Sequence, residues 1–186
     1  MKNQLGILGY TEINELIDEG VIEFADRKNV NPASLNVSLG PIFLEESRDN
    51  EAVSGVHHGC LSFAKRESPA FYKRTGSTVL SPGAFCLASI VEKLNLPCDI
   101  IGHLLLRSSA ARMGIEHSLA GFADPNFNGH LTLEVQNILR FHSIKLVAGD
   151  QICQLIFHRI HPVPAGNCYK GKYSFSADPV EVRKEI

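Results

Sequence analysis

A short segment near the middle of the chain combines the residue types that bind phosphate. It contains, in order, Arg107, Ser108, Ser109, Ala110, Ala111 and Arg112. The alanines favour a helical turn whose start either serine is suited to cap, and the turn's free N–H groups, the hydroxyls and a guanidinium together suit an anion. Arg107 has the planar, two-pronged geometry that matches phosphate oxygens. The alternative is a capped surface helix with two solvated arginines.

A second segment, residues 130–136, alternates apolar and polar residues. In a strand this pattern gives an apolar face and a polar face, formed by Leu131, Leu133 and Val135, and by Thr132, Glu134 and Gln136. If the polar face lines a pocket, burial raises the pKa of Glu134, whereas a neighbouring Arg112 lowers it. Such a carboxylate can take a proton from water and deliver it to another atom. The alternative is a solvated glutamate on an outward-facing strand.

Residues 120–129 join these two segments and are rich in turn-forming residues. Gly121 has no side chain, so a planar ligand can approach its backbone closely. Asp124 suits a hydrogen bond from a sugar hydroxyl, or it starts the turn at Pro125, which is the commoner role of an Asp-Pro pair.

The elements that would position these residues are mostly strands. A short helix is predicted at residues 11–19, with Thr11 as its cap and Gly20 at its end. Alternating or apolar runs predict strands at 35–39, 84–94, 130–136 and 151–160. Many short strands separated by turns indicate a closed or sandwiched β architecture. We expect one domain over residues 1–186, with 46–77 as an insert or hairpin and 162–186 as a C-terminal arm.

Composition narrows the class of protein. The chain has 186 residues, 44% hydrophobic content and a net charge of −2, so it lacks the basic footprint of a nucleic-acid-binding protein. No apolar run is long enough for a membrane span or a signal peptide, which predicts a cytoplasmic protein. The five cysteines are odd in number and none is spaced as C-x-x-C, so we expect reduced thiols rather than disulfides or a zinc site.

Taken in order, the segments resemble the dCTP deaminase family, including its bifunctional dUMP-forming members, within the dUTPase-like superfamily. The specific matches are Arg-Ser-Ser-x-x-Arg at 107–112, Ala-Gly-Phe-x-Asp at 120–124 and Thr-Leu-Glu at 132–134. Individually weaker matches lie at 31–39, 82–87, 96–97, 151–155 and 169–173. The resemblance covers most of the chain apart from residues 46–77.

This resemblance implies a distorted β-barrel of the dUTPase type, jelly-roll-like, with a short N-terminal helix and a short helix after Arg107. It also implies a homotrimer with active sites at subunit interfaces, with dCTP and dUTP as ligands and dTTP as a feedback inhibitor. Mg²⁺ would be carried by the triphosphate. Zinc is not implied, since Cys98 has no cysteine three residues later and no H-x-E precedes it.

The resemblance also implies roles for individual residues. Glu134 would move protons as water adds to C4 of cytosine and ammonia leaves, while Arg112 and Ser108 orient the glutamate and the water. The implied nucleotide contacts are Arg107, Ser108, Ser109, Ala110, Ala111, Arg112, Asp124, Thr132, Leu133, Glu134, Gln154, Tyr169, Lys172 and Ser176. Among these, Tyr169 and Lys172 would belong to an arm that closes over the triphosphate.

The pair Gly121-Phe122 resembles that of the dUMP-forming members, which deaminate dCTP and then cleave the α–β phosphate link. The chain departs from the family pattern at Leu106, Asn36, Leu119 and Ser176, where glycine, aspartate, threonine and glutamine are usual. Two alternatives remain open at this stage. One is a monofunctional dUTP diphosphatase, and the other is a non-catalytic nucleotide-binding regulator on the same fold.

Overall fold

The computed structural model describes residues 4–46, 71–118, 120–171, 173–176 and 178–179. Within these ranges the helical elements are α1 (Tyr10–Asp18), η1 (Arg27–Asn29) and α2 (Ser108–Arg112). The strands are β1 (Gly6–Ile7), β2 (Ile22–Glu23), β3 (Leu35–Val37), β4 (Leu39–Glu46), β5 (Phe71–Thr75), β6 (Ser77–Leu80), β7 (Phe85–Asn95), β8 (Ile100–Leu106), β9 (Ile115–Glu116), β10 (Phe122–Ala123), β11 (Asn128–Asn137), β12 (Ile144–Val147) and β13 (Cys153–Arg159). The mainly β prediction is confirmed, including the short helices near the N-terminus and after Arg107.

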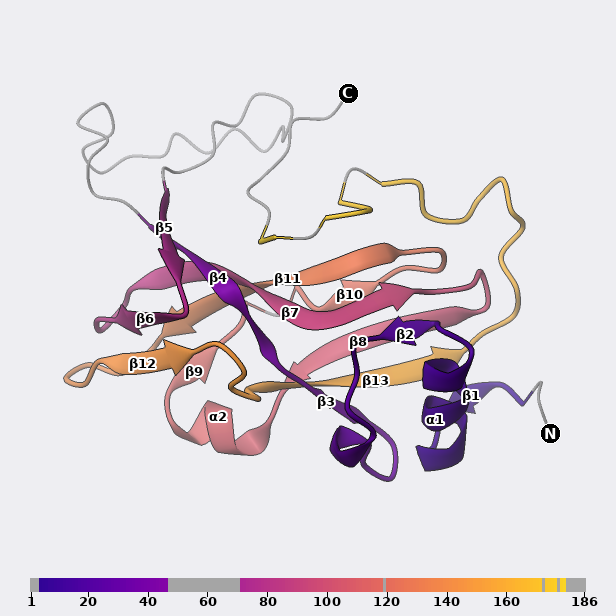
Figure 1. The fold of residues 1–186 in the computed structure, drawn as a ribbon, viewed down its shortest axis with the longest axis horizontal. Coiled ribbons are helices and arrows are strands. Elements are labelled where there is room, and N and C mark those ends of the chain that lie inside the picture. The colour runs from indigo at the N-terminus through magenta and orange to yellow at the C-terminus, as the bar shows by residue number, and fades with distance from the viewer. Residues whose placement is uncertain (1–3, 47–70, 119, 172, 177, 180–186) are drawn as a thin grey trace.

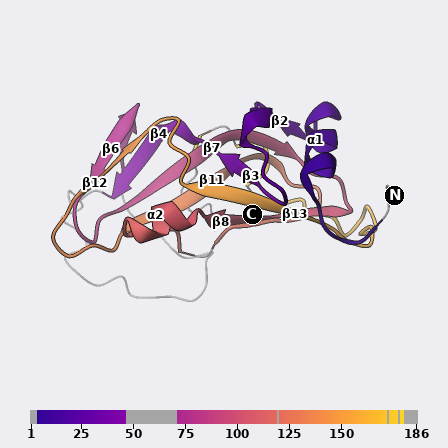
Figure 2. The same ribbon diagram turned by 90° about the horizontal axis from the view of Figure 1, so that it is seen from below.

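In the described part of the chain the strands form two larger sheets and a two-stranded ribbon. Sheet A has the order β1-β13-β8-β10, with β3 also paired to β13, and sheet B has the order β5-β4-β7-β11-β9, with β2 also paired to β7. Strands β6 and β12 make the ribbon. Figures 1 and 2 show α1 near the end of this arrangement where the N-terminus lies, β6 and β12 at the other end, and α2 between the two. Residues 47–70, most of the expected insert, lie outside the described residues, and the strands that flank them, β4 and β5, pair antiparallel.

Alternation along the central strands builds one hydrophobic core. Leu133 and Val135 of β11 are fully buried, as are Leu155 and Phe157 of β13, and all four belong to the same cluster. Removing side chains of this size from water stabilises the fold by about 1.5–3 kcal/mol each. The predicted apolar face of residues 130–136 is therefore confirmed, and Glu134 lies on the opposite face of β11 from the core.

Helix α1 is capped in different ways at its two ends. The N-cap is Gly9, whose N–H donates to the Glu12 carboxylate at 2.7 Å. The predicted cap at Thr11 is wrong, because a glutamate inside the first turn satisfies the free N–H from within the helix. Gly20 follows the C-cap with a φ of 71°, a conformation that favours glycine, so the predicted helix end is confirmed. No helix within the described ranges has the length and apolar character needed to cross a membrane.

Asn137, at the end of β11, is a fully buried polar residue that fastens three segments together. Its Nδ2 donates to the carbonyl oxygens of Leu80 and His142, both at 2.9 Å. Its Oδ1 accepts from the N–H of Leu139, also at 2.9 Å. The side chain thus supplies the hydrogen bonds that the irregular chain around the end of β11 cannot make for itself.

We expect Asn137→Ala to destabilise the protein by about 3 kcal/mol, because three backbone groups, one of them buried and two partly buried, lose the partner that this side chain supplies. At this chain length that loss corresponds to a melting temperature lower by roughly 6–12 °C. The matched control is Asn126→Gly, which removes one exposed bond to the Tyr169 carbonyl and tolerates the φ of 72° at this position. Thermal unfolding of the two variants side by side tests this, and equal melting temperatures would contradict the assigned role of Asn137.

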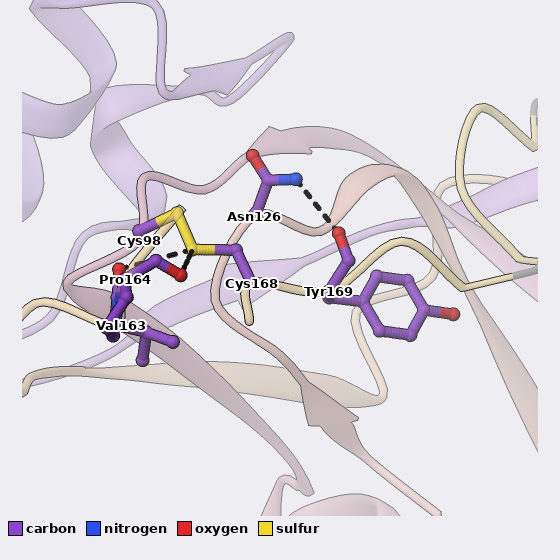
Figure 3. Close-up of a disulfide and its surroundings, with 6 residues drawn as sticks. All are labelled: Cys98, Asn126, Val163, Pro164, Cys168 and Tyr169. Atoms are coloured by element: carbon purple, nitrogen blue, oxygen red, sulfur yellow. Dashed lines mark hydrogen bonds between the residues drawn. A yellow bond between two sulfur atoms is a disulfide. The ribbon is translucent and has the colours of Figure 1, made fainter. Parts of the chain in front are cut away.

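The chain after β13 returns along the loop that precedes β8 and is fixed there by a disulfide. The N–H groups of Ile160 and Val163 donate to the carbonyl oxygens of Asp99 and Cys98, both at 2.9 Å. Cys98 and Cys168 then form a disulfide across a sequence separation of 70 residues, as Figure 3 shows. The expectation of reduced thiols is therefore wrong for this pair, since topology rather than local spacing brings the two sulfurs together. Cys86 and Cys153 are free and buried.

Candidate functional site

The segment predicted to bind an anion begins where β8 ends. Arg107 is the N-cap of α2, and its guanidinium donates to the carbonyl oxygen of Gln151 at 3.0 Å. Buried Ala110 anchors the short helix, while Arg112 and both serines are exposed. The predicted capping by Ser108 or Ser109 is wrong, because the N-cap residue is Arg107 and it makes no side-chain cap bond. The two hydroxyls at the start of this helix and Arg112 at its end are therefore exposed.

Gln154 lies beside this segment, on β13. It pairs with Leu105 in sheet A, and the adjacent pair joins Cys153 to Leu106, directly before Arg107. Its side-chain Oε1 accepts from the hydroxyl of Ser34 at 3.0 Å. Sheet A thus brings Gln154, Arg107 and the start of α2 to the same end of two neighbouring strands.

Glu134 lies on β11 of sheet B, with Thr132 and Gln136 on the same face. Its cross-strand partner is Leu87 on β7, which in turn pairs with Leu44 on β4. These apolar neighbours give the carboxylate little solvation. Burial raises the pKa of Glu134 to about 7, against the opposing effect of its own backbone N–H. Its Oε2 is buried and has no hydrogen-bond partner among the described residues.

Glu92 shows why this arrangement at Glu134 is unusual. Glu92 is also buried, and burial raises its pKa to about 6. Both of its oxygens, however, accept from the N–H of Ser38, at 3.0 and 3.2 Å. A buried carboxylate whose oxygens both accept hydrogen bonds from the protein, as in Glu92, is suited to a structural role. A buried carboxyl that has an oxygen without a hydrogen-bond partner among the described residues and a pKa near neutral, as in Glu134, is suited to exchange protons.

The structure does not bring all the predicted site residues together in one copy of the chain. Within the described residues, no hydrogen bond or ion pair joins Glu134 to Arg112 or Ser108. The anion-binding group belongs to sheet A and α2, whereas Glu134 belongs to sheet B. Leu133, another predicted contact, has its side chain fully buried in the core, so only its backbone can reach a ligand.

Gly121 and its neighbours form the edge of sheet A. A Cβ at Gly121 would overlap the carbonyl oxygen of Leu104, whose N–H bonds the Gly121 oxygen at 2.7 Å. The backbone of β8 therefore leaves no room for a side chain at residue 121. Phe122 is 49% exposed and lies edge-on to His103 at 5.0 Å. Asp124 starts a turn, since its carbonyl oxygen accepts from the Phe127 N–H at 3.0 Å.

The predicted arm lies along the beginning of β11. The Tyr169 N–H donates to Pro125 at 2.9 Å, and its ring centroid lies 6.0 Å from that of Phe127. Farther along, the carbonyl oxygen of Ser176 accepts from the His130 N–H at 3.1 Å. Ser176 is buried, and its hydroxyl donates to Tyr173 at 3.1 Å. Lys172 lies outside the described residues.

Two features of this region had no assigned role from the sequence. One is the Cys98–Cys168 disulfide, which precedes Tyr169 directly and which no local cysteine spacing signals. The other is a small polar cluster behind Gln154, formed by Asn31, Ser34 and Asn36. The only sequence signal for it was the match at residues 31–39, which carried no residue roles.

Comparison with known proteins matches this chain to one group. A family model described as dCTP deaminase-like matches residues 7–160. A dUMP-forming dCTP deaminase of Coprothermobacter proteolyticus is 32% identical over 171 residues, covering 88% of this chain and 87% of that protein. A dCTP deaminase of Natronomonas pharaonis is 33% identical over 193 residues, covering 97% of each.

A solved structure shares the fold. The 2′-deoxycytidine 5′-triphosphate deaminase from Agrobacterium tumefaciens superposes with a TM-score of 0.66 at 22% sequence identity. The match covers 84% of this chain and 47% of that chain, so this chain spans about half its length. The fold expected from the resemblance is thereby confirmed.

Proposed function

Because this chain belongs to the dCTP deaminase-like family, we propose that it hydrolyses dCTP to dUTP and ammonia and then cleaves dUTP to dUMP and diphosphate. Seven of eight relatives that are 28–34% identical to this chain carry the name dCTP deaminase, dUMP-forming. The observation that carries the proposal is the buried, unpartnered oxygen of Glu134, in a carboxyl whose pKa burial raises to about 7.

Glu134 suits the proton transfers that deamination needs. Water adds to C4 of the cytosine ring while the Glu134 carboxylate takes one of its protons. The carboxyl gives that proton to ring atom N3, then takes the proton of the added hydroxyl and gives it to the N4 amino group. The C4–N4 bond breaks as the C4 carbonyl forms, and ammonia leaves. A carboxyl with a pKa near the working pH can both accept and release the proton, which is what these two steps require.

We further propose that the site is completed between copies of the chain in a homotrimer. The support is that, among the residues that the structure describes, no hydrogen bond or ion pair joins the anion-binding group to Glu134 within one copy. Ser108, Ser109 and Arg112 are exposed on α2, with the half-buried Arg107 as its N-cap, and Glu134 lies on the face of sheet B opposite the core. In this assembly Arg112 and Ser108 of one copy orient the water and the Glu134 carboxylate of its neighbour. Ala110 and Ala111 hold the short helix in place, and Thr132 and the Leu133 backbone border the base.

The donor set of sheet A fits a triphosphate that carries its own Mg²⁺. Arg107, Ser108, Ser109 and Gln154 offer N–H and O–H donors, which suit phosphate oxygens rather than a bare cation. Within the described residues no group of three or more His, Cys, Asp or Glu side chains is placed to hold a metal ion. When bound, Mg²⁺ would neutralise phosphate charge, while the protein groups hold the phosphate oxygens.

Product analysis tests the proposal. With Mg²⁺ present, dCTP should give ammonia together with dUMP and diphosphate, and dUTP should give dUMP and diphosphate. Nucleotides are separated by chromatography, and ammonia is measured by a coupled assay. The first step would be contradicted by dCTP that binds without ammonia release, and the second by dUTP accumulating as the end product. The second step also tests the assignment of Gly121 and Phe122 to dUMP formation.

The pKa of Glu134 predicts a pH dependence of deamination. Water activation needs the carboxylate form, so kcat/KM for dCTP should rise about tenfold per pH unit below the pKa and level off above about 7. Arg112 of the assembled site would move this midpoint downward. Initial rates between pH 5 and 9 measure the profile, and a rate that is flat across this range would contradict the role of Glu134.

A further inference from the structure

We infer that Ser34 and Asn31 are positioning residues that fix the orientation of the Gln154 side chain, so that its amide NH₂ group, and not its carbonyl oxygen, faces a phosphate oxygen of the nucleotide. The inference rests on the proposed function, because it specifies how Gln154 recognises the triphosphate. It concerns two residues that do not themselves touch the ligand.

A tight turn places the two residues side by side. Pro32 and Ala33 form its tip, and the Asn31 N–H closes it by donating to the Ser34 carbonyl oxygen at 2.7 Å. Proline favours such a turn because its φ is already fixed. Ser34 is 8% exposed, so its hydroxyl must find its partners within the protein.

The hydrogen bonds of Asn31 determine which atoms of the cluster donate and which accept. Its Nδ2 is surrounded by three oxygens: Asn36 Oδ1 at 3.0 Å, Ser34 Oγ at 3.3 Å and the Asn29 carbonyl at 3.4 Å. Only the nitrogen end of an amide can satisfy such a set, because an oxygen there would face other acceptors. The Ser34 hydroxyl therefore accepts a bond from Asn31.

A hydroxyl that accepts from Asn31 still has one proton to donate. The oxygen atom available to it is Gln154 Oε1, at 3.0 Å and 120 residues away in sequence. If the Gln154 amide were flipped, Ser34 Oγ would face two amide donors and its own proton would lose this acceptor. The relay from Asn31 through Ser34 thus holds the Gln154 carbonyl oxygen inward and leaves its NH₂ group directed away from the cluster.

The exposed NH₂ group suits a phosphate. Gln154 is only partly buried and lies one strand pair from Leu106, directly before Arg107. Phosphate oxygens accept hydrogen bonds and repel a carbonyl oxygen, so the orientation of this amide decides between attraction and repulsion. At this end of sheet A, Arg107 supplies a positive charge. Gln154 supplies an uncharged N–H donor whose direction is fixed.

The test uses four variants and two measurements. The variants are Ser34→Ala, Ser34→Thr, Gln154→Ala and Gln154→Glu. The measurements are steady-state kinetics with dCTP and Mg²⁺, and equilibrium binding of dCTP to each variant combined with Glu134→Gln, so that binding is measured without turnover. Melting temperatures establish that each variant is folded.

Ser34→Ala should raise KM and the dissociation constant about three- to tenfold and leave kcat within about twofold, because the amide loses its orientation but not its presence. Ser34→Thr keeps the hydroxyl and should restore wild-type values. Gln154→Glu should bind more weakly than Gln154→Ala, because a carboxylate in the same place presents an oxygen to the phosphate. Should Ser34→Ala fail to fold, Asn31→Ala tests the same relay and should shift KM in the same direction.

Two results would overturn the inference. One is a Gln154→Glu variant that binds dCTP as tightly as the wild type, which would mean that an oxygen faces the ligand. The other is a Ser34→Ala change that still raises KM in the Gln154→Ala background, since a residue acting only through Gln154 should have no further effect there. If the wild type neither binds dCTP nor releases ammonia, it is the proposed function that fails.

Discussion

Glu134→Gln is expected to lower ammonia release from dCTP by about 10³-fold or more and, at the same time, to make the protein more stable. Glutamine keeps the size of the side chain but cannot accept a proton from water. The increase in stability follows from burial, which raises the pKa of Glu134 to about 7 from its usual 4.5. A merely structural residue would lose stability on the same change.

The sign of the stability effect follows from proton linkage. The folded protein holds the Glu134 proton more tightly than the unfolded chain, so stability decreases as the pH rises from about 4.5 to about 7. Above pH 7 the desolvated carboxylate costs up to about 3 kcal/mol, less whatever Arg112 returns in the assembled site. Glutamine removes this cost, and its stabilising effect should therefore be largest above pH 7 and absent below pH 4.5.

Thermal unfolding at pH 5 and pH 8, together with the ammonia assay, measures both effects. Glu46→Gln is the matched control, since Glu46 is an exposed carboxylate of the same sheet. It should change neither quantity. A Glu134→Gln protein that still releases ammonia, or that unfolds more readily at pH 8, would remove Glu134 from its assigned role.

The second large effect concerns the division of the site between copies of the chain. Glu134→Gln and Arg112→Ala should each be inactive alone, yet a mixture assembled together should recover roughly a quarter of the wild-type activity. In a random mixture, that is the fraction of interfaces at which an intact Glu134 meets an intact Arg112. A site contained in one copy would recover nothing.

The two variants are co-expressed with different affinity tags, and oligomers carrying both tags are isolated before the assay. This selection removes the homotrimers, so the expected recovery rises from about a quarter to about a third, because each mixed trimer has one productive interface out of three. The control replaces one partner with the double variant Glu134→Gln/Arg112→Ala, in which no interface can combine an intact pair. Mixed oligomers that remain inactive would show that Arg112 and Glu134 act within the same copy.

Much of the fold around the site could be predicted from the sequence, because it depends on local patterns. Period-two alternation over residues 130–136 gave both the strand and the outward face of Glu134. The same reasoning located the strand at β13 and the end of α1 at Gly20. The start of α2 could not be predicted as closely. The residue before the two serines is the N-cap, and the helix has no side-chain cap bond.

Other parts depend on contacts between distant segments, which local patterns do not encode. Gly121 is explained by the Leu104 backbone on the neighbouring strand, and the Ser34 relay by a glutamine 120 residues away. The raised pKa of Glu134 comes from Leu87 and its neighbours, which belong to another strand. In each case the sequence shows the residue type, but the residue that it contacts lies on another segment and is brought close only by the pairing of the strands.

The disulfide between Cys98 and Cys168 turns the C-terminal arm into a short tether. Its fixed point is the residue before Tyr169. The backbone of Tyr169 bonds to Pro125 and Asn126, and the arm bonds to the chain again at Asn128, whose carbonyl oxygen accepts from the Phe175 N–H at 2.6 Å. A tether this short holds the arm at a high local concentration next to β11, so its docking is an intramolecular equilibrium with little chain entropy to lose. Reducing the disulfide would remove none of the residues that dock the arm against β11. Docking would still weaken, because the released arm would sample a larger volume when undocked and would lose more chain entropy on docking.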